Sequence, residues 1–186
     1  MPPETEPGRV DGPMAAPSAP AATRPRGSLA WWLIAAIIVL DQASKALVQH
    51  FVPVYGSVTV IPGLLDLVHI HNAGVAFGLM NDVDHPWRST FTTGLALAAL
   101  AGIVYYSRQM RPDERLARAG LSLILGGAVG NLIDRFRIGH VVDFVDVYRG
   151  SWHFWAFNVA DAAITCGAVL IFAELIFPSR NVSHPV

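Results

Sequence analysis

The chain has 186 residues, of which 53% are hydrophobic and only 15% are charged, and its mean hydropathy is +0.43. Soluble domains carry roughly 25% charged residues, so this composition argues against a soluble fold. The formal net charge of −1 provides no basic surface for nucleic acid, and no nucleic-acid partner is expected.

The first 27 residues are rich in Pro, Ala and Gly. Such a segment buries too little apolar surface to become ordered, so residues 1–27 are predicted to form a disordered tail. A single membrane domain is predicted to follow at residues 28–178, and residues 179–186 are predicted to form a C-terminal tail.

Four apolar segments follow the tail, at about residues 29–48, 91–106, 116–133 and 159–177. A helix needs roughly 20 residues to cross the hydrocarbon core of a bilayer. The second and third segments reach this length only if their polar flanks join the helices. The pattern predicts an all-α membrane protein with four transmembrane helices, since backbone groups in lipid must bond within their own segment.

Arg and Lys are distributed unequally between the two sides of this predicted bundle. The N-terminal tail, the middle connection and the C-terminal tail together hold eight arginines, and the other two connections hold four. The positive-inside rule therefore places both termini in the cytoplasm. Aromatic residues at the segment ends are typical of membrane–water interfaces; they are Trp31, Trp32, Tyr105, Tyr106, Trp152 and Trp155.

The two outer connections differ in pattern. Residues 57–61 and 65–71 alternate in polarity and contain β-branched side chains, which predicts a small β-sheet on the outer face. Residues 136–155 are predicted to form an interfacial segment.

With this topology, polar residues from distant segments gather in one layer near the outer surface. They are Asp41, Lys45, Asn131, Asp134, Arg135, Asp143 and Asp161. Ionisable residues in membrane helices are costly, so this layer is a candidate functional site. Asp41 and Lys45 are four residues apart and are predicted to form a structural ion pair. Asp134 is expected to be solvated at a helix end, and Arg135 to hold a carbonyl or a lipid phosphate.

Asp143 and Asp161 suggest acid–base chemistry. Two neighbouring carboxyls share one proton, so one can activate water while the other donates to a substrate carbonyl, as in an aspartyl peptidase. The residues alone leave two alternatives open. One is a small transporter or proton-conducting protein that uses Asp41, Asp134 and Asp161 as a relay. The other is an assembly factor without catalytic activity.

Other chemistries find little support. His69 and His71 are predicted to face one side of a strand, but a zinc site needs further ligands and no HExxH motif occurs. The glycines of residues 126–130 lack the ending of a phosphate loop and favour close helix packing. Cys166 is the only cysteine, so no intrachain disulfide is possible, and it is expected to be a small buried side chain. No G-x-S-x-G motif indicates a serine nucleophile.

Five motifs occur in order along the chain: residues 41–45 (DQASK), 72–78 (NAGVAFG), 130–135 (GNLIDR), 141–144 (VVDF) and 157–161 (FNVAD). Together they resemble the signature of the lipoprotein signal peptidases, also called signal peptidase II. The resemblance implies an endopeptidase of the bacterial inner membrane. Such an enzyme removes the signal peptide from prolipoproteins by cutting just before a diacylglyceryl-modified cysteine.

The resemblance also implies roles for individual residues. Asp143 and Asp161 match the catalytic pair of that family. Supporting or substrate-binding positions are implied at Asp41, Lys45, Asn72, Gly74, Asn131, Asp134, Arg135, Asn158 and Ala160. No metal or organic cofactor is implied. Prolipoproteins and membrane lipids are the implied partners, and a monomer is expected.

Overall fold

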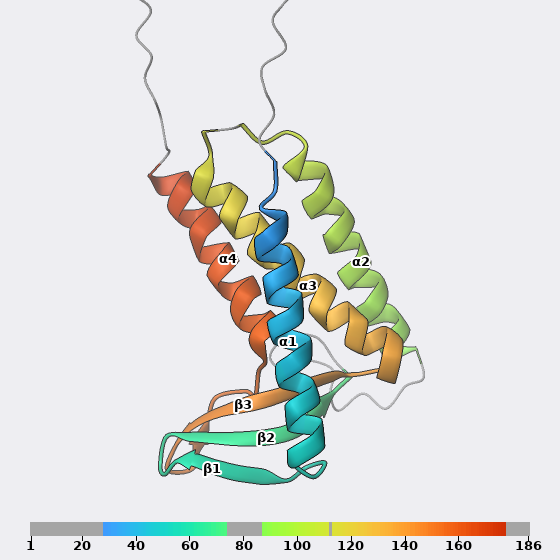
Figure 1. The fold of residues 1–186 in the computed structure, drawn as a ribbon, viewed down its shortest axis with the longest axis vertical. Coiled ribbons are helices and arrows are strands. Elements are labelled where there is room, and N and C mark those ends of the chain that lie inside the picture. The colour runs from blue at the N-terminus through green and yellow to red at the C-terminus, as the bar shows by residue number, and fades with distance from the viewer. Residues whose placement is uncertain (1–27, 74–86, 112, 178–186) are drawn as a thin grey trace, which may run out of the picture.

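The computed structural model describes residues 28–73, 87–111 and 113–177 (Figure 1). Its helices are α1 (Trp31–Phe51), α2 (Arg88–Ser107), α3 (Arg115–Ile138) and α4 (Val159–Ile176), and its strands are β1 (Ser57–Ile61), β2 (Leu65–Asn72), β3 (Val141–Arg149) and β4 (Trp152–His153). The sheet lies at the end of the bundle where α1 ends and α4 begins (Figure 1). The predicted tails at residues 1–27 and 179–186, and the predicted site residue Gly74, lie outside the described residues.

The four predicted helices are confirmed, and each is long and apolar enough to cross a membrane. The polar flanks do join α2 and α3, and α3 continues beyond Ile133, where the apolar segment ends, to Ile138. The apolar pattern stops early there because the last turns of α3 carry the polar residues of the site.

Two helix ends explain how the chain passes between the bundle and the sheet. Val52 ends α1 in an extended conformation, which is the conformation that a following proline favours. Gly139 ends α3 with a φ of 81° and donates its N–H to the carbonyl of Arg135. Glycine adopts this left-handed conformation without a steric penalty. The chain therefore turns sharply from α3 into β3.

The sheet is antiparallel, with strand order β1-β2-β3-β4. The two predicted strands, at residues 57–61 and 65–71, are confirmed as β1 and β2. Residues 136–155, predicted only as an interfacial segment, contain β3 and β4 as well. The sequence did not indicate β3, because alternation of polar and apolar residues marks a strand with one buried face. The first four residues of β3 are all buried, so this alternation is absent there.

Helix α3 lies at the centre of the bundle and contacts each of the other three helices. Its glycines let α4 approach closely. A Cβ on Gly127 would lie 2.4 Å from the carbonyl oxygen of Ala160, and one on Gly120 would lie 2.6 Å from that of Gly167. This confirms the interpretation of the glycine-rich segment as a packing surface, since small residues allow two helix backbones to meet.

The outer surface of the bundle is apolar. The aromatic residues predicted at the interfaces are exposed, as Trp32 on α1 and Tyr105 on α2 illustrate. Cys166 is also exposed, so the prediction that it is buried is wrong. Hydrophobicity could not reveal this, because a membrane helix is apolar on the lipid-facing side as well as on the packed side.

Candidate active site

Asp143 and Asp161 come from different elements and meet at one asparagine. Asp143 lies on β3, and Asp161 is the third residue of α4. The side-chain amide of Asn158 donates to Asp143 Oδ1 at 2.8 Å. The Asn158 Oδ1 accepts from the backbone N–H of Asp161 at 2.9 Å, and the backbone N–H of Asn158 donates to Asp161 Oδ2 at 3.3 Å. This capping box begins α4 and holds both acidic residues against Asn158.

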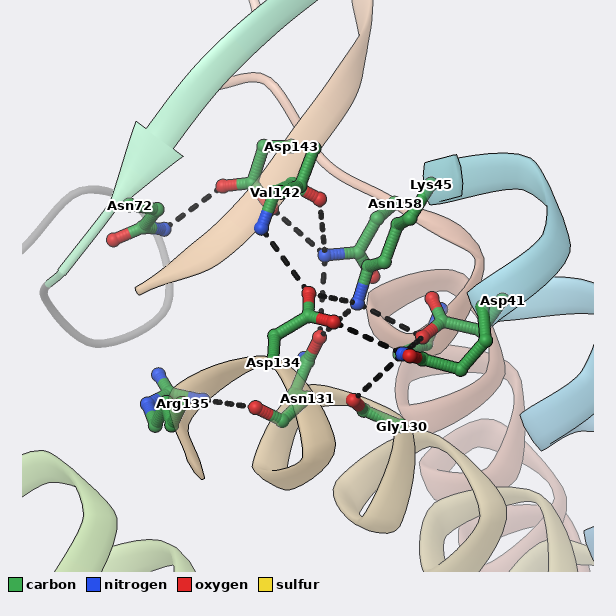
Figure 2. A network of polar contacts seen from close by, with 12 residues as sticks. Asp41, Lys45, Asn72, Gly130, Asn131, Asp134, Arg135, Val142, Asp143 and Asn158 are labelled. Atoms are coloured by element: carbon green, nitrogen blue, oxygen red, sulfur yellow. Dashed lines mark hydrogen bonds and ion pairs between the residues drawn. The ribbon is translucent and has the colours of Figure 1, made fainter. Parts of the chain in front are cut away.

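Two further asparagines complete the contacts of this pair. Asn72, the last residue of β2, donates to Asp143 Oδ2 at 2.9 Å (Figure 2). Asn131 on α3 donates to Asp161 Oδ1 at 2.8 Å. Three asparagines from different parts of the fold therefore orient the two carboxyls. Such amide donors favour the ionised form of a carboxyl.

The environment of Asp143 opposes ionisation more strongly than these donors support it. Burial, followed by the nearby charge of Asp161, raises the pKa of Asp143 from 3.8 to about 7. The hydrogen bonds from Asn72 and Asn158 and the positive charge of Lys45 act in the opposite direction. The effect of Asp161 on Asp143 is what two carboxyls that compete for one proton produce.

A buried ion network lies close to the two carboxyls. Lys45 Nζ lies 2.8 Å from Asp41 Oδ2 and 2.8 Å from Asp134 Oδ2, and all three side chains are at most 4% exposed. The predicted pair of Asp41 and Lys45 is confirmed. The prediction that Asp134 is solvated is wrong, because α3 extends beyond it and Asp134 faces α1 as the second partner of Lys45.

Asp134 and Asp41 also bind the backbone of neighbouring elements. Asp134 Oδ2 accepts from the N–H of Val142 on β3 at 3.2 Å. Asp41 Oδ1 accepts from the N–H of Ala160 on α4 at 3.0 Å. The ion network thus joins α1 and α3 to the residues immediately before Asp143 and Asp161.

Gln42 belongs to this network but was not predicted as a site residue. Its amide donates to Asp134 Oδ1 at 2.9 Å and to the carbonyl of Gly130 at 3.2 Å. Its place in the first motif is the only signal in the sequence. Position 130 requires glycine, because a Cβ there would lie 2.6 Å from Asp41 Oδ2.

Arg135 lies apart from Lys45 and Asp41, at the left of the network in Figure 2. Its guanidinium donates to the carbonyl of Asn131 at 3.3 Å, so the carbonyl that it binds belongs to its own helix. It also lies within electrostatic range of Asp161 and Asp143. Arg135 therefore adds positive charge near the pair from a side that Lys45 does not occupy.

The histidines near β2 contact one another ring to ring, edge to face between His69 and His71 and stacked between His71 and His140. The rings of His69 and His71 are 5.1 Å apart, which confirms that they share one side of β2. The ring of His71 stacks on that of His140 with 3.8 Å between the ring centres, and burial lowers the pKa of both His71 and His140. Within the described residues, no group of three or more His, Cys, Asp or Glu side chains is arranged to hold a metal ion.

Comparisons with known proteins point to one family. Residues 33–177 match the family model described as signal peptidase (SPase) II. A lipoprotein signal peptidase of Geobacter metallireducens is 44% identical over 146 residues, covering 78% of this chain and 89% of that protein. One of Solibacter usitatus is 43% identical and covers 83% and 94%, respectively.

A solved structure of a bacterial membrane enzyme has a similar fold. It is titled a bacterial membrane enzyme structure by the in meso method at 2.3 Å resolution. It is 26% identical to this chain, with a TM-score of 0.72, and the match covers 88% of this chain and 99% of the solved one.

Proposed function

The chain belongs to the signal peptidase II family, and from this we propose that Asp143 and Asp161 are its catalytic pair. The protein is an aspartic endopeptidase of a bacterial membrane that removes signal peptides from prolipoproteins. The transporter and the assembly factor, which the residues alone left open, are not favoured by this membership.

One observation carries the catalytic proposal: Asn158 binds Asp143 through its side-chain amide and caps α4 at Asp161. Asn158 also keeps Asp143 near enough to Asp161 for the charge of Asp161 to raise the pKa of Asp143, and two buried carboxyls this close share a proton. The ionised carboxyl then removes a proton from water, and the water oxygen attacks the scissile carbonyl carbon. The protonated carboxyl donates to the carbonyl oxygen.

The second half of the reaction reverses these roles. The tetrahedral intermediate collapses, the C–N bond breaks, and the leaving amine nitrogen takes a proton from the carboxyl that had accepted one from water. The other carboxyl recovers its proton from the hydroxyl of the intermediate. One shared proton is required throughout, so cleavage falls at low pH, where both carboxyls are protonated.

The proposed substrate bond lies just before a cysteine that carries a diacylglyceryl group. With its signal helix in the bilayer and its acyl chains in lipid, such a substrate presents this bond at the end of a transmembrane bundle. The pair lies at the end that carries the sheet, as the arrangement in Figure 1 illustrates. Holding the bond there is catalysis by proximity.

The proposed orientation places the sheet and the active site on the periplasmic side of the inner membrane, with both termini in the cytoplasm. The excess of arginine in the tails and in the middle connection supports it. So does the position of the start of α1 and the end of α4, which lie together at the end of the bundle away from the sheet (Figure 1).

The supporting residues take roles that follow from their contacts. Asn72, Asn131 and Asn158 orient the two carboxyls. Arg135, within electrostatic range of both, stabilises negative charge that develops on the substrate carbonyl oxygen. The peptidase domain is proposed to span residues 28–178, between the two tails, and to act as a monomer on prolipoproteins among membrane lipids.

The test is to replace each carboxyl by an amide and to follow cleavage of a lipidated precursor peptide in detergent. We expect Asp143→Asn and Asp161→Asn each to abolish detectable cleavage while the protein remains folded and binds the peptide. Asp113→Asn is the matched control, because Asp113 pairs with Arg111 on the surface between α2 and α3. Full cleavage by either active-site variant would refute the assignment, and ion flux in liposomes without proteolysis would favour the transporter.

A further inference from the structure

Each of the two central asparagines can bind a carboxyl only if its amide group points the right way. An asparagine amide has one end that accepts and one that donates hydrogen bonds, and the two ends have nearly the same shape. Asn158 is fixed by α4, because its oxygen caps the helix at Asp161 and its nitrogen must then face Asp143. Asn131 lies within α3 and has no helix end to fix it.

Lys45, on α1, makes the shorter of the two contacts that fix the orientation of the Asn131 amide; the other comes from Asn158. Lys45 Nζ donates to Asn131 Oδ1 at 2.9 Å, and the Asn131 Nδ2 at the other end of the same amide donates to Asp161 Oδ1 at 2.8 Å. Turning the amide over would place its NH₂ group against the ammonium and its oxygen against the carboxylate. A lysine ammonium donates but cannot accept, so its contact permits only the observed orientation.

The Asn131 amide is also linked to Asp143, through Asn158. The amide of Asn158 donates to Asn131 Oδ1 at 3.2 Å as well as to Asp143 Oδ1 at 2.8 Å. Asn131 Oδ1 therefore accepts from both Lys45 and Asn158. A chain of hydrogen bonds runs from the buried ammonium through the two amides to both carboxyls.

We propose that Lys45 is a positioning residue for the peptidase reaction: through Asn131 it sets the amide orientation that holds Asp161 and Asp143 in place. This rests on the proposed catalytic pair. It goes beyond a structural ion pair, because Asp41 and Asp134 by themselves explain why Lys45 is tolerated in the bundle but not why a third contact reaches Asn131.

Two features of the network shape the test. Removing Lys45 alone would leave two buried carboxylates without their counter-charge, and the protein would lose stability. The exchange Asp41→Asn with Lys45→Met removes one charge of each sign, so the total charge of the network is unchanged and only Asp134 loses its counter-charge. The amide introduced by Asp41→Asn retains an oxygen that can accept from the Ala160 N–H, as the Asp41 carboxylate does.

The experiment is a double-mutant cycle between this neutral exchange and Asn131→Ala, measured as kcat and KM for a lipidated precursor peptide in detergent. In the wild-type background we expect the exchange to lower kcat by about tenfold to a hundredfold, the effect of losing one charge-assisted hydrogen bond. KM should stay within about twofold. In the Asn131→Ala background the same exchange should change kcat by less than about threefold, because the amide through which Lys45 acts is already absent.

Equal losses of kcat in both backgrounds would overturn the proposal, as would a wild-type kcat in the exchange variant. Glu174→Gln is the control, since Glu174 is a buried carboxyl near the end of α4 away from the active site. If Asp41→Asn with Lys45→Met fails to fold, Asp134→Asn with Lys45→Met is used instead. Failure of both exchange variants to fold would also overturn the proposal. The role of Lys45 would then be to stabilise the helix bundle and not to orient the Asn131 amide. None of these outcomes alters the test of Asp143 and Asp161.

Discussion

Gly127 offers a sharp test of whether helix packing holds the catalytic geometry. Gly127→Ala would place a Cβ 2.4 Å from the carbonyl oxygen of Ala160 and 2.9 Å from Ile164 Cγ1. Real Cβ atoms are essentially never found closer than 3.0 Å, so α3 and α4 must separate by at least about 0.6 Å. The first contact is with backbone and cannot be relieved by a side-chain rotation.

The displacement falls on the residues that position Asp161. Ala160 binds Asp41 through its N–H, and Asp161 follows it directly and binds Asn131 on α3. Overpacking of this kind costs about 1–3 kcal/mol of stability. Misplacing a reacting group by about 1 Å costs up to about a hundredfold in rate. We therefore expect kcat to fall by about tenfold to a hundredfold.

Thermal unfolding in detergent and cleavage of a lipidated precursor peptide measure the two effects. The unfolding midpoint should fall by about 2–4 °C for each kcal/mol lost in a chain of this size. Gly94→Ala in α2 is the matched control, because nothing lies within 4 Å of a Cβ at that position. A wild-type midpoint and kcat in Gly127→Ala would show that this contact does not set the distance between α3 and α4.

Two further predictions follow from Asp143 and Asn158. The pKa of Asp143 is raised from 3.8 to about 7, so the folded protein holds a proton that the unfolded chain releases between these values. Its contribution to stability is therefore complete below about pH 4 and is lost as the pH rises through about 7. The decline of the unfolding midpoint from pH 4 to 8 should be weaker in Asp143→Asn, and an identical slope would contradict this. Asn158→Asp keeps the oxygen that caps α4 but replaces the donor to Asp143 by an acceptor. We expect helix capping to survive and cleavage to be lost, so a variant with normal cleavage would show that the Asn158 donor is dispensable.

Features that depend on residues close together along the chain were predictable from the sequence. The apolar segments had to become helices because lipid offers no partner for backbone groups, and all four are confirmed. The pair of Asp41 and Lys45 followed from a spacing of four residues on a helix. The alternating strands β1 and β2 were recognisable for the same local reason.

Features that depend on the packing of distant segments needed the tertiary structure. Strand β3 was not predicted because it is buried on both faces in its first half, and the burial of Asp134 was missed because its partner Lys45 lies on another helix. The outward position of Cys166 was missed because lipid and protein interior favour the same side chains.

By itself, the sequence determined which segments cross the membrane and which polar residues gather at one end of the bundle, because each of these depends on hydrophobicity and spacing along one segment. Only the tertiary structure decided that Asn158 joins Asp143 to Asp161 and that Lys45 reaches Asn131. The physical reason is that a hydrogen bond requires two groups within about 3 Å, and for residues on separate elements this distance is set by how those elements pack.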